Sequence, residues 1–232
     1  MKDSGNFYLT SLYPFQDGVI RIMRTLNTPF FLTGGTALAR GYLGHRYSDD
    51  LDFFVNDDSA FLEHVRRFED ALRNSSSEGM WQIDEAGTIR SERFISFSLL
   101  RGDVLLKIDL VNDIAFRVGD IVQDKELGAL DTIGNMISNK IGALFRYAEK
   151  DIADIWAIWK KYGASWPEVM QNAQRKDAGI DAVSAAEIIG TFPSGRFDKI
   201  TWSNPVDRSS FFVDLRTISE EILGLSARLF PQ

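Results

Sequence analysis

The sequence has no cysteine and only two histidines among its 232 residues. The absence of cysteine excludes disulfides, thiol nucleophiles and cysteine metal sites, and it is typical of a reducing cytoplasm. His45 and His64 are too few for a histidine-rich metal site. No apolar stretch approaches the roughly 18 residues that a membrane span needs, and the N-terminal residues lack the apolar segment of a signal peptide. We therefore expect a soluble, cytoplasmic protein with no membrane contact.

The sequence also has no excess of positive charge. Its formal net charge is −7, because 26 lysines and arginines face 33 aspartates and glutamates. Residues 1–113 carry 12 basic and 17 acidic side chains, and the remainder carries 14 and 16. Neither half is a basic module for duplex nucleic acid. A nucleic acid held at one end by a few local basic residues stays compatible with this balance.

Hydrophobic periodicity divides the chain into a mixed N-terminal part and a helical C-terminal part. In the first part we predict helices at 15–27, 36–43 and 59–74 and strands at 30–33, 51–55, 80–84, 93–100 and 104–111. From about residue 131 the pattern is helical, with predicted helices at 131–147, 151–162, 166–175, 182–190 and 207–228. These elements predict an α+β domain over residues 1–125 and a helical domain over residues 126–232. The loop before the last helix, which contains Arg196 and Lys199, is expected to be solvated, although contact with a substrate is an alternative.

Acidic residues stand inside two apolar strands. In the strand at 51–55, alternation places Asp50 and Asp52 on one face and apolar residues on the other. Asp109 lies in the same way within the apolar strand 104–111. If the two strands are neighbours, the three carboxylates face one pocket, where a divalent cation such as Mg²⁺ offsets their repulsion. The alternative is a solvated strand start and an edge-strand charge that blocks aggregation. Asp49 faces the other way and is interpreted as a solvated loop residue.

A glycine turn precedes these acids. Gly34 and Gly35 follow the short strand 30–33, and Thr36 stands at the expected start of a helix. Glycines let the backbone approach a ligand closely, and the exposed N–H groups of a helix start favour an anionic phosphate. A tight turn, with Thr36 as an ordinary helix N-cap, is the alternative interpretation.

The stretch GGTALARGYLGHRYSDDLDFFV resembles the AbiEii/AbiGii-type nucleotidyltransferases, within the polymerase-β-like superfamily. The resemblance lies in Gly-Gly-Thr at 34–36, in Arg46 and Ser48 ahead of Asp50 and Asp52, and in the later strand acid Asp109. It extends over roughly residues 30–162. It implies the polymerase-β-like nucleotidyltransferase fold, a mixed sheet flanked by helices, followed by a helical C-terminal part.

The resemblance also implies which residues form the site. Asp50, Asp52 and Asp109 would bind two Mg²⁺ ions, and Asp109 would help to deprotonate the attacking hydroxyl. The triphosphate of an NTP such as ATP would lie against the glycine turn, the basic residues and one hydroxyl: Gly34, Gly35, Thr36, Arg46, Ser48 and Lys140.

The predicted helix 131–147 carries Lys140 in the middle of its apolar stripe. Its ammonium either reaches the substrate cleft, as the resemblance implies, or pairs with a buried acid or the surface. Asp151 and Asp154 share one face of the next helix. The resemblance places them near the cleft, whereas helix capping by Asp151 is the alternative. Arg146 pairs with one of these acids or touches the substrate. His45, with no visible partner, is interpreted as a surface residue.

The resemblance implies an enzyme that transfers NMP from an NTP to a hydroxyl acceptor. That acceptor would be an RNA such as a tRNA 3′ end, and the protein would act as the toxin of a toxin–antitoxin or phage-resistance system. Its partner would then be a cognate antitoxin protein. Transfer to a small molecule, as in antibiotic-modifying relatives, is one alternative. A non-catalytic nucleotide-binding regulator is another, although such a protein has no physical need for three poorly compensated acids.

Overall fold

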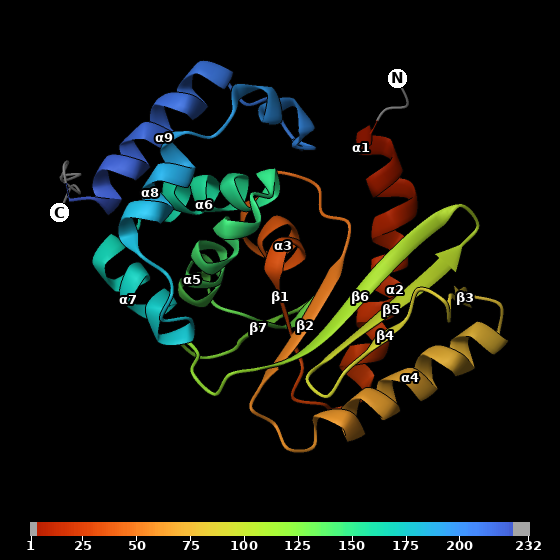
Figure 1. Ribbon diagram of the computed structural model, residues 1–232. Coiled ribbons are helices and arrows are strands. Elements are labelled where there is room, and N and C mark those ends of the chain that lie inside the picture. Colours follow the sequence, from red (N-terminus) through yellow and green to blue (C-terminus); the bar gives the residue numbers. More distant parts are fainter. Residues whose placement is uncertain (1–3, 225–232) are drawn as a thin grey trace. The chain divides into compact units, whose positions relative to one another are not determined.

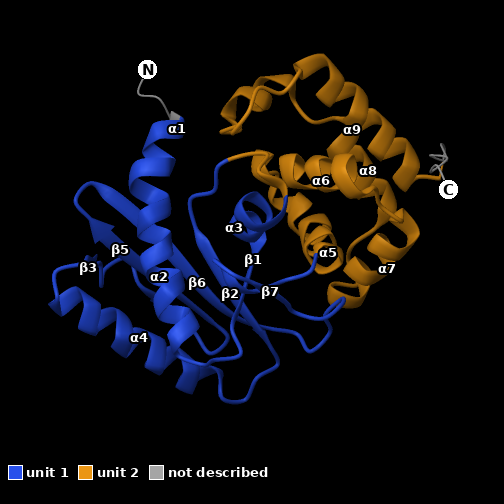
Figure 2. Ribbon diagram, turned by 180° about the vertical axis from the view of Figure 1, so that it is seen from behind, with its two compact units in different colours: residues 1–42, 47–132 blue, residues 43–46, 133–232 orange. Residues whose placement is uncertain are grey.

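The computed structural model describes residues 4–224. The chain forms two compact units (Figure 2). The first comprises residues 1–42 and 47–132, and the second comprises residues 43–46 and 133–232. The chain therefore leaves the first unit for four residues, between the glycine turn and the acidic strand, and returns to it. Among the described residues, no helix is long and apolar enough to cross a membrane.

The first unit is built on an eight-stranded mixed sheet with the strand order β3-β5-β6-β2-β1-β8-β7, in which β4 also pairs with β5. Its centre consists of β1, β2 and β6 (Figure 1). Strand β2 runs antiparallel to β1 and parallel to β6. The strands are β1 (Phe31–Thr33), β2 (Leu51–Asn56), β3 (Gln82–Ile83), β4 (Ile89–Arg90), β5 (Phe94–Arg101), β6 (Val104–Asp113), β7 (Val122–Asp124) and β8 (Gly128–Leu130).

One face of this sheet forms the core of the first unit. Along β2, Leu51, Phe53 and Val55 are buried, as the alternation predicted. The ring of Phe53 lies 6.4 Å from that of Phe68, on α4 (Phe61–Ser77). Helix α2 (Tyr13–Thr25) lies beside α4 (Figure 1). Because the apolar side chains of β2 point toward this helical layer, the intervening residues of the strand face the other side of the sheet.

The second unit is helical. It contains α5 (Ile133–Ala143), a 3₁₀ turn (Leu144–Arg146), α6 (Glu149–Tyr162), α7 (Trp166–Lys176), α8 (Ala182–Gly190), a second 3₁₀ turn (Ser194–Lys199) and α9 (Arg208–Ile222). The loop before α9, expected to be solvated, is packed instead. Phe197 and Ile200 are buried, and the ring of Phe197 lies 5.2 Å from that of Phe211. The expectation was wrong because three aromatic side chains lie within or just after this loop and supply it with a core of its own.

The mixed sheet flanked by helices confirms the predicted fold class, and several element boundaries differ. Residues 4–12 are helical and were not predicted, and neither were the short strands β4, β7 and β8. The predicted helix 131–147 stops at Ala143, and the predicted end of the last helix at 228 lies outside the described residues. Thr36 is not an N-cap, because α3 (Gly34–Thr36) already begins at Gly34 and its N-cap is Thr33.

Candidate functional site

A row of polar side chains crosses the centre of the sheet. Strand register pairs Asp52 of β2 with Asp109 of β6, Thr33 of β1 with Asp52, and Ser96 of β5 with Asp109. Residues paired across neighbouring strands point to the same face and lie about 5 Å apart. The two acids therefore lie next to each other, on the face opposite the core, as the sequence predicted for neighbouring strands.

One carboxylate oxygen of Asp109 contacts a lysine, and the other has no hydrogen-bond partner. Its Oδ2 lies 2.7 Å from Nζ of Lys107, two residues earlier on the same face. Its Oδ1 is buried without a hydrogen-bond partner, and so is Oγ of Ser96 on the adjacent strand. A buried carboxylate oxygen without a donor is costly, so this position favours an additional ligand.

The three acids together raise the pKa of Lys107. Burial lowers the pKa of Lys107, but Asp109, Asp50 and Asp52 outweigh this effect and raise the pKa above its ordinary value. The ammonium therefore stays charged and offsets part of the repulsion among the three carboxylates.

The glycine turn is pressed against Asp52. Gly34 has a φ of +65°, and a Cβ built on it would lie 2.3 Å from Oδ2 of Asp52. Both the left-handed backbone and the absence of room require glycine here. The sequence predicted that this glycine allows a close approach, and in the structure the group that approaches is a carboxylate of the same chain.

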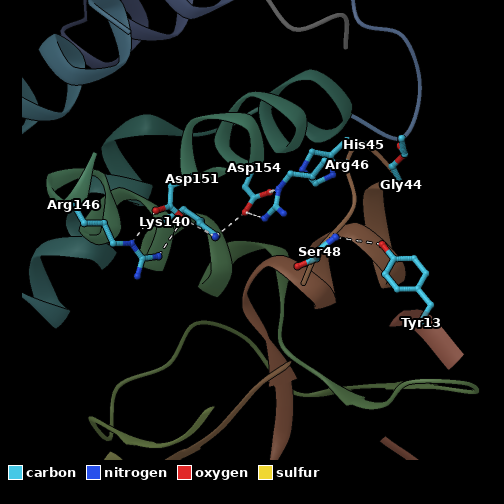
Figure 3. A network of polar contacts seen from close by, with 10 residues as sticks. Tyr13, Gly44, His45, Arg46, Ser48, Lys140, Arg146, Asp151 and Asp154 are labelled. Atoms are coloured by element: carbon cyan, nitrogen blue, oxygen red, sulfur yellow. Dashed lines mark hydrogen bonds and ion pairs between the residues drawn. The ribbon is translucent and has the colours of Figure 1, made fainter. Parts of the chain in front are cut away.

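The hydroxyl of Thr36 holds the start of the acidic strand. It is buried and donates a hydrogen bond to the main-chain carbonyl of Asp50. The carbonyl of Ser48 accepts a hydrogen bond from Gln16, and its N–H donates to the hydroxyl of Tyr13 (Figure 3). These bonds fix the backbone on which Asp50 and Asp52 stand. Contact of Thr36 or Ser48 with a nucleotide stays a prediction.

A further buried acid was missed in the sequence. Asp131, directly after β8, is fully buried, and its Oδ2 accepts a hydrogen bond of 2.7 Å from the hydroxyl of Thr33. Thr33 is the register neighbour of Asp52. Asp131 thus fixes the hydroxyl of Thr33, the last member of the polar row. The only signal in the sequence is an acid after the short apolar segment 127–130, which is too brief to be recognised as a strand.

The second unit contains a buried network of charges (Figure 3). Nε of Arg46 lies 2.7 Å from Oδ1 of Asp154, and Nζ of Lys140 lies 2.7 Å from Oδ2 of Asp154 and from Oδ1 of Asp151. Arg146 completes the network with a contact of 2.9 Å between its Nε and Oδ2 of Asp151. Lys140 is thus paired with buried acids, one of the two interpretations that its position allowed. Contact of Arg46 or Lys140 with a nucleotide stays a prediction.

Asp151 is not a helix cap, because α6 begins at Glu149 and its N-cap is Ala148. Burial raises the pKa of Asp154, but the charges of Arg46 and Lys140 outweigh burial and hold the pKa well below its usual range. Both acids of the pair are therefore ionised and serve as counter-ions.

His45 belongs to the same network, and its interpretation as a surface residue was wrong. Its side chain is 6% exposed, and Nε2 lies 2.8 Å from Oδ1 of Asp154. Burial lowers the pKa of His45 and outweighs the opposing effect of Asp154, so the ring is neutral near pH 7. The partner could not be seen in the sequence because it lies 109 residues away.

Comparison with known proteins decides the family. The model of the family "Nucleotidyl transferase AbiEii toxin, Type IV TA system" matches residues 21–215. The chain belongs to the AbiEii nucleotidyltransferase toxin family. The match includes the glycine turn, the acidic row and the charged network.

Relatives of this AbiEii chain have been found by sequence and by structure. The uncharacterized protein aq_aa25 of Aquifex aeolicus is 28% identical over 157 residues, or 66% of this chain and 68% of that protein. A candidate nucleotidyltransferase of Helicobacter pylori, solved by crystallography, has a TM-score of 0.58 and 17% identity over 93% of this chain and 97% of its own. JHP933 from the same organism has a TM-score of 0.57, also with 17% identity, over 93% and 94%. At this identity the two structures are similar in fold.

Asp50, Asp52 and Asp109 form an acidic row, and their carboxylate oxygens are suitable ligands for a divalent cation. Carboxylate oxygens are the ligands that Mg²⁺ prefers. Asp52 and Asp109 are register neighbours, Asp50 stands two residues before Asp52, and Oδ1 of Asp109 lacks a donor. Among residues 4–224, however, no three acidic or histidine side chains are already gathered as a metal-binding group. Lys107 holds the other oxygen of Asp109, Oδ2, so its ammonium competes with a cation for this carboxylate.

Proposed function

We propose that this chain transfers NMP from an NTP to a hydroxyl acceptor with the help of Mg²⁺ held by Asp50, Asp52 and Asp109. The observation that carries the proposal is the pairing of Asp52 with Asp109 on adjacent strands, with Gly34 packed against Asp52. Membership of a nucleotidyltransferase family supports the same reaction. Two ions would lower the repulsion between the triphosphate and an attacking oxygen.

In the proposed reaction, the acceptor oxygen attacks the α-phosphorus of the NTP. The bond between that phosphorus and the oxygen bridging to the β-phosphate breaks, and pyrophosphate leaves with the electron pair. Oδ1 of Asp109, which lacks a donor, takes the proton of the acceptor hydroxyl. Asp52 and Asp50 would hold the cation, which would offset the negative charge of the α-phosphoryl group. Thr36 and Gly34 keep this part of the backbone in place.

We further propose that the acceptor is RNA, modified at a 3′ end, and that the protein is a toxin with a cognate antitoxin. The family description supports the toxin assignment. The acidic net charge of −7 favours an acceptor that is held at one end over an extensive duplex interface.

Removal of one carboxylate tests the catalytic assignment. Asp52→Asn removes a ligand charge from the row, so we expect the rate of label transfer from an α-³²P-labelled NTP to fall at least about 100-fold, since a lost electrostatic group in the site costs that much. The matched control is Asp103→Asn, in the exposed hairpin turn between β5 and β6. Equal transfer by wild type and Asp52→Asn would reject the assignment.

The acceptor is identified by where the label goes. Wild-type protein is incubated with labelled NTP, Mg²⁺ and total cellular RNA or a small-molecule extract. Label that is retained on RNA and released by ribonuclease supports RNA, whereas label in a small soluble product supports the antibiotic-modifying alternative. Binding of NTP without transfer to either pool would support a regulatory protein.

Expression in cells tests the toxin assignment. Wild-type protein is expected to arrest growth, and Asp52→Asn protein at the same level is not, because arrest requires the reaction. Growth arrest by both proteins would show that toxicity does not depend on Asp52.

A further inference from the structure

A cavity of about 320 Å³ lies within the second unit, and none of its lining residues belongs to the charged network. Its walls come from the turn after α5, from α8 and from the segment that follows α8. The lining residues are aromatic, aliphatic and polar in nearly equal parts, and they include Phe145, Tyr147, Ser184, Glu187, Thr191 and Arg196. A cavity of this size matches a small ligand or one nucleotide residue.

Two aromatic residues at this cavity are exposed. Phe145 is 41% exposed and Tyr147 is 60% exposed. Tyr147 ends the 3₁₀ turn Leu144–Arg146 with a left-handed backbone, φ +55°, and its N–H donates a hydrogen bond to the carbonyl of Leu144. Its carbonyl accepts a hydrogen bond from the guanidinium of Arg196, which helps to hold this conformation. The backbone of Tyr147 is therefore held on both sides while its ring lies in solvent.

The polar residues of the cavity complement these rings. Glu187 of α8 is exposed, and Ser184 lies one turn earlier on the same helix. Arg196 supplies a positive charge at the wall, with Nη1 4.0 Å from Oε2 of Glu149. Exposed aromatic rings stack on bases, arginine binds phosphate or stacks on a base, and a carboxylate accepts a hydrogen bond from an amino group of a base.

We propose that this cavity binds one unpaired nucleotide of the RNA acceptor. The base stacks on Tyr147 and Phe145, Glu187 accepts a hydrogen bond from its amino group, and Arg196 contacts the adjoining phosphate. This assignment rests on the proposed RNA acceptor and adds a place where that RNA is held. The cavity favours a base over a purely apolar side chain of a protein partner, because a carboxylate, a guanidinium and two hydroxyl groups share its wall with the rings.

Binding of short RNA tests the assignment without the transfer reaction. A fluorescent single-stranded oligoribonucleotide with a free 3′ hydroxyl is titrated with the full chain and Mg²⁺ in the absence of NTP, and anisotropy is measured. Tyr147→Ala is expected to weaken binding about tenfold, as expected when one stacking ring is lost. Phe145→Ala, at an ordinary backbone position, is expected to act in the same direction. Tyr162→Ala is the matched control, because Tyr162 is 49% exposed and does not line the cavity.

The carboxylate gives a second measurement. Wild-type protein is expected to prefer oligonucleotides ending in A, C or G over those ending in U, and Glu187→Gln is expected to reduce this preference, since only the first three bases carry an exocyclic amino group. Unchanged binding by both Tyr147→Ala and Phe145→Ala, or no RNA binding by wild type, would overturn the assignment.

The two proposals fail in different ways. If wild type transfers label to RNA and Tyr147→Ala does so with an unchanged KM, the cavity is not the binding place and the function stands. If label goes only to a small molecule while RNA still binds through Tyr147, the proposed acceptor fails and the cavity stands.

Discussion

Lys107 is an ammonium beside the proposed metal ligands, and its Nζ lies 2.7 Å from Oδ2 of Asp109. Its side chain is 42% exposed, so it has room to swing toward solvent. In the absence of a cation, it reduces the repulsion among the acids. A cation that binds between Asp52 and Asp109 competes with it for the same carboxylate.

Removing this competitor is expected to strengthen metal binding. Lys107→Gln should lower the Kd for Mn²⁺ or Mg²⁺ about fivefold, because an exposed ion pair of this kind contributes at most about 1 kcal/mol. Calorimetric titration in the absence of NTP measures this directly. Lys107→Arg, which keeps the charge, is the control and should bind metal like wild type. A Kd that does not change in Lys107→Gln would show that Lys107 leaves Asp109 free for the metal.

Asp154 is the residue on which the charged network depends, since it pairs with Arg46, Lys140 and His45. Asp154→Asn leaves two buried cations with one carboxylate, so the free energy of unfolding should fall by about 3–5 kcal/mol. Urea unfolding followed by circular dichroism measures the loss. Asp198→Asn breaks the exposed pair with Arg208 and should cost under about 1 kcal/mol. Similar losses in both variants would contradict the structural role of the network.

At the scale of elements, the strands illustrate what the sequence can predict. Alternation along 51–55 and 104–111 identified the side of each strand that bears an acid, because this pattern is local. Ser96 and Thr33 were not identified, since short polar residues are unremarkable in strands and only the register places them beside Asp109 and Asp52. Asp131 was missed because β8 is three residues long.

The contacts of the segment 43–46 could not be predicted either, because its partners are distant in the sequence. It lies against the loop before α9, where Arg46 forms an isolated bridge with Trp202 and the carbonyl of His45 accepts a hydrogen bond from the N–H of Ser203. The sequence identified Arg46 by its motif and predicted a phosphate contact, whereas its structural partner lies 108 residues away. Contacts between residues so far apart in the sequence produce no periodic sequence pattern, so they cannot be predicted from it.

His45 makes the stability of this segment dependent on pH. Burial holds the folded-state pKa of His45 below its unfolded value of about 6.5. Folding therefore excludes a proton, and the free energy of unfolding should decrease as the pH falls from about 6.5 toward the folded pKa. His45→Gln should flatten this decrease, as urea unfolding at pH 7.5 and 5.5 would show. The lowered pKa of Asp154 acts only below about pH 3.8, so it does not mask the effect. An unchanged pH dependence in His45→Gln would contradict the assignment.

At the scale of the whole molecule, the division into units does not follow the order of the chain. The sequence predicted two consecutive domains with a boundary at 125/126. Compact units instead include residues 43–46 with residues 133–232. A change in composition along the chain indicates where helices replace strands, but it cannot show that four early residues pack with late ones.

The consequence for a fragment is direct. A polypeptide of residues 133–232 lacks His45 and Arg46, so it should be less stable than the same polypeptide with a supplied or fused segment 43–46. Circular dichroism and urea unfolding of the two polypeptides would measure the difference. Equal stability would show that Asp154 is sufficiently paired by Lys140 alone.

Because the second unit combines residues 43–46 with residues 133–232, its two parts are synthesised at different times. Arg46 leaves the ribosome 108 residues before Asp154 does, so this cation has no permanent partner while most of the sheet is being made. The acidic strand β2 begins at Leu51, five residues after Arg46. A nascent chain that is interrupted before α6 would thus contain the carboxylates of the proposed active site but not the counter-ion that fixes the loop leading into them. Activity would then be withheld until α6 has been translated.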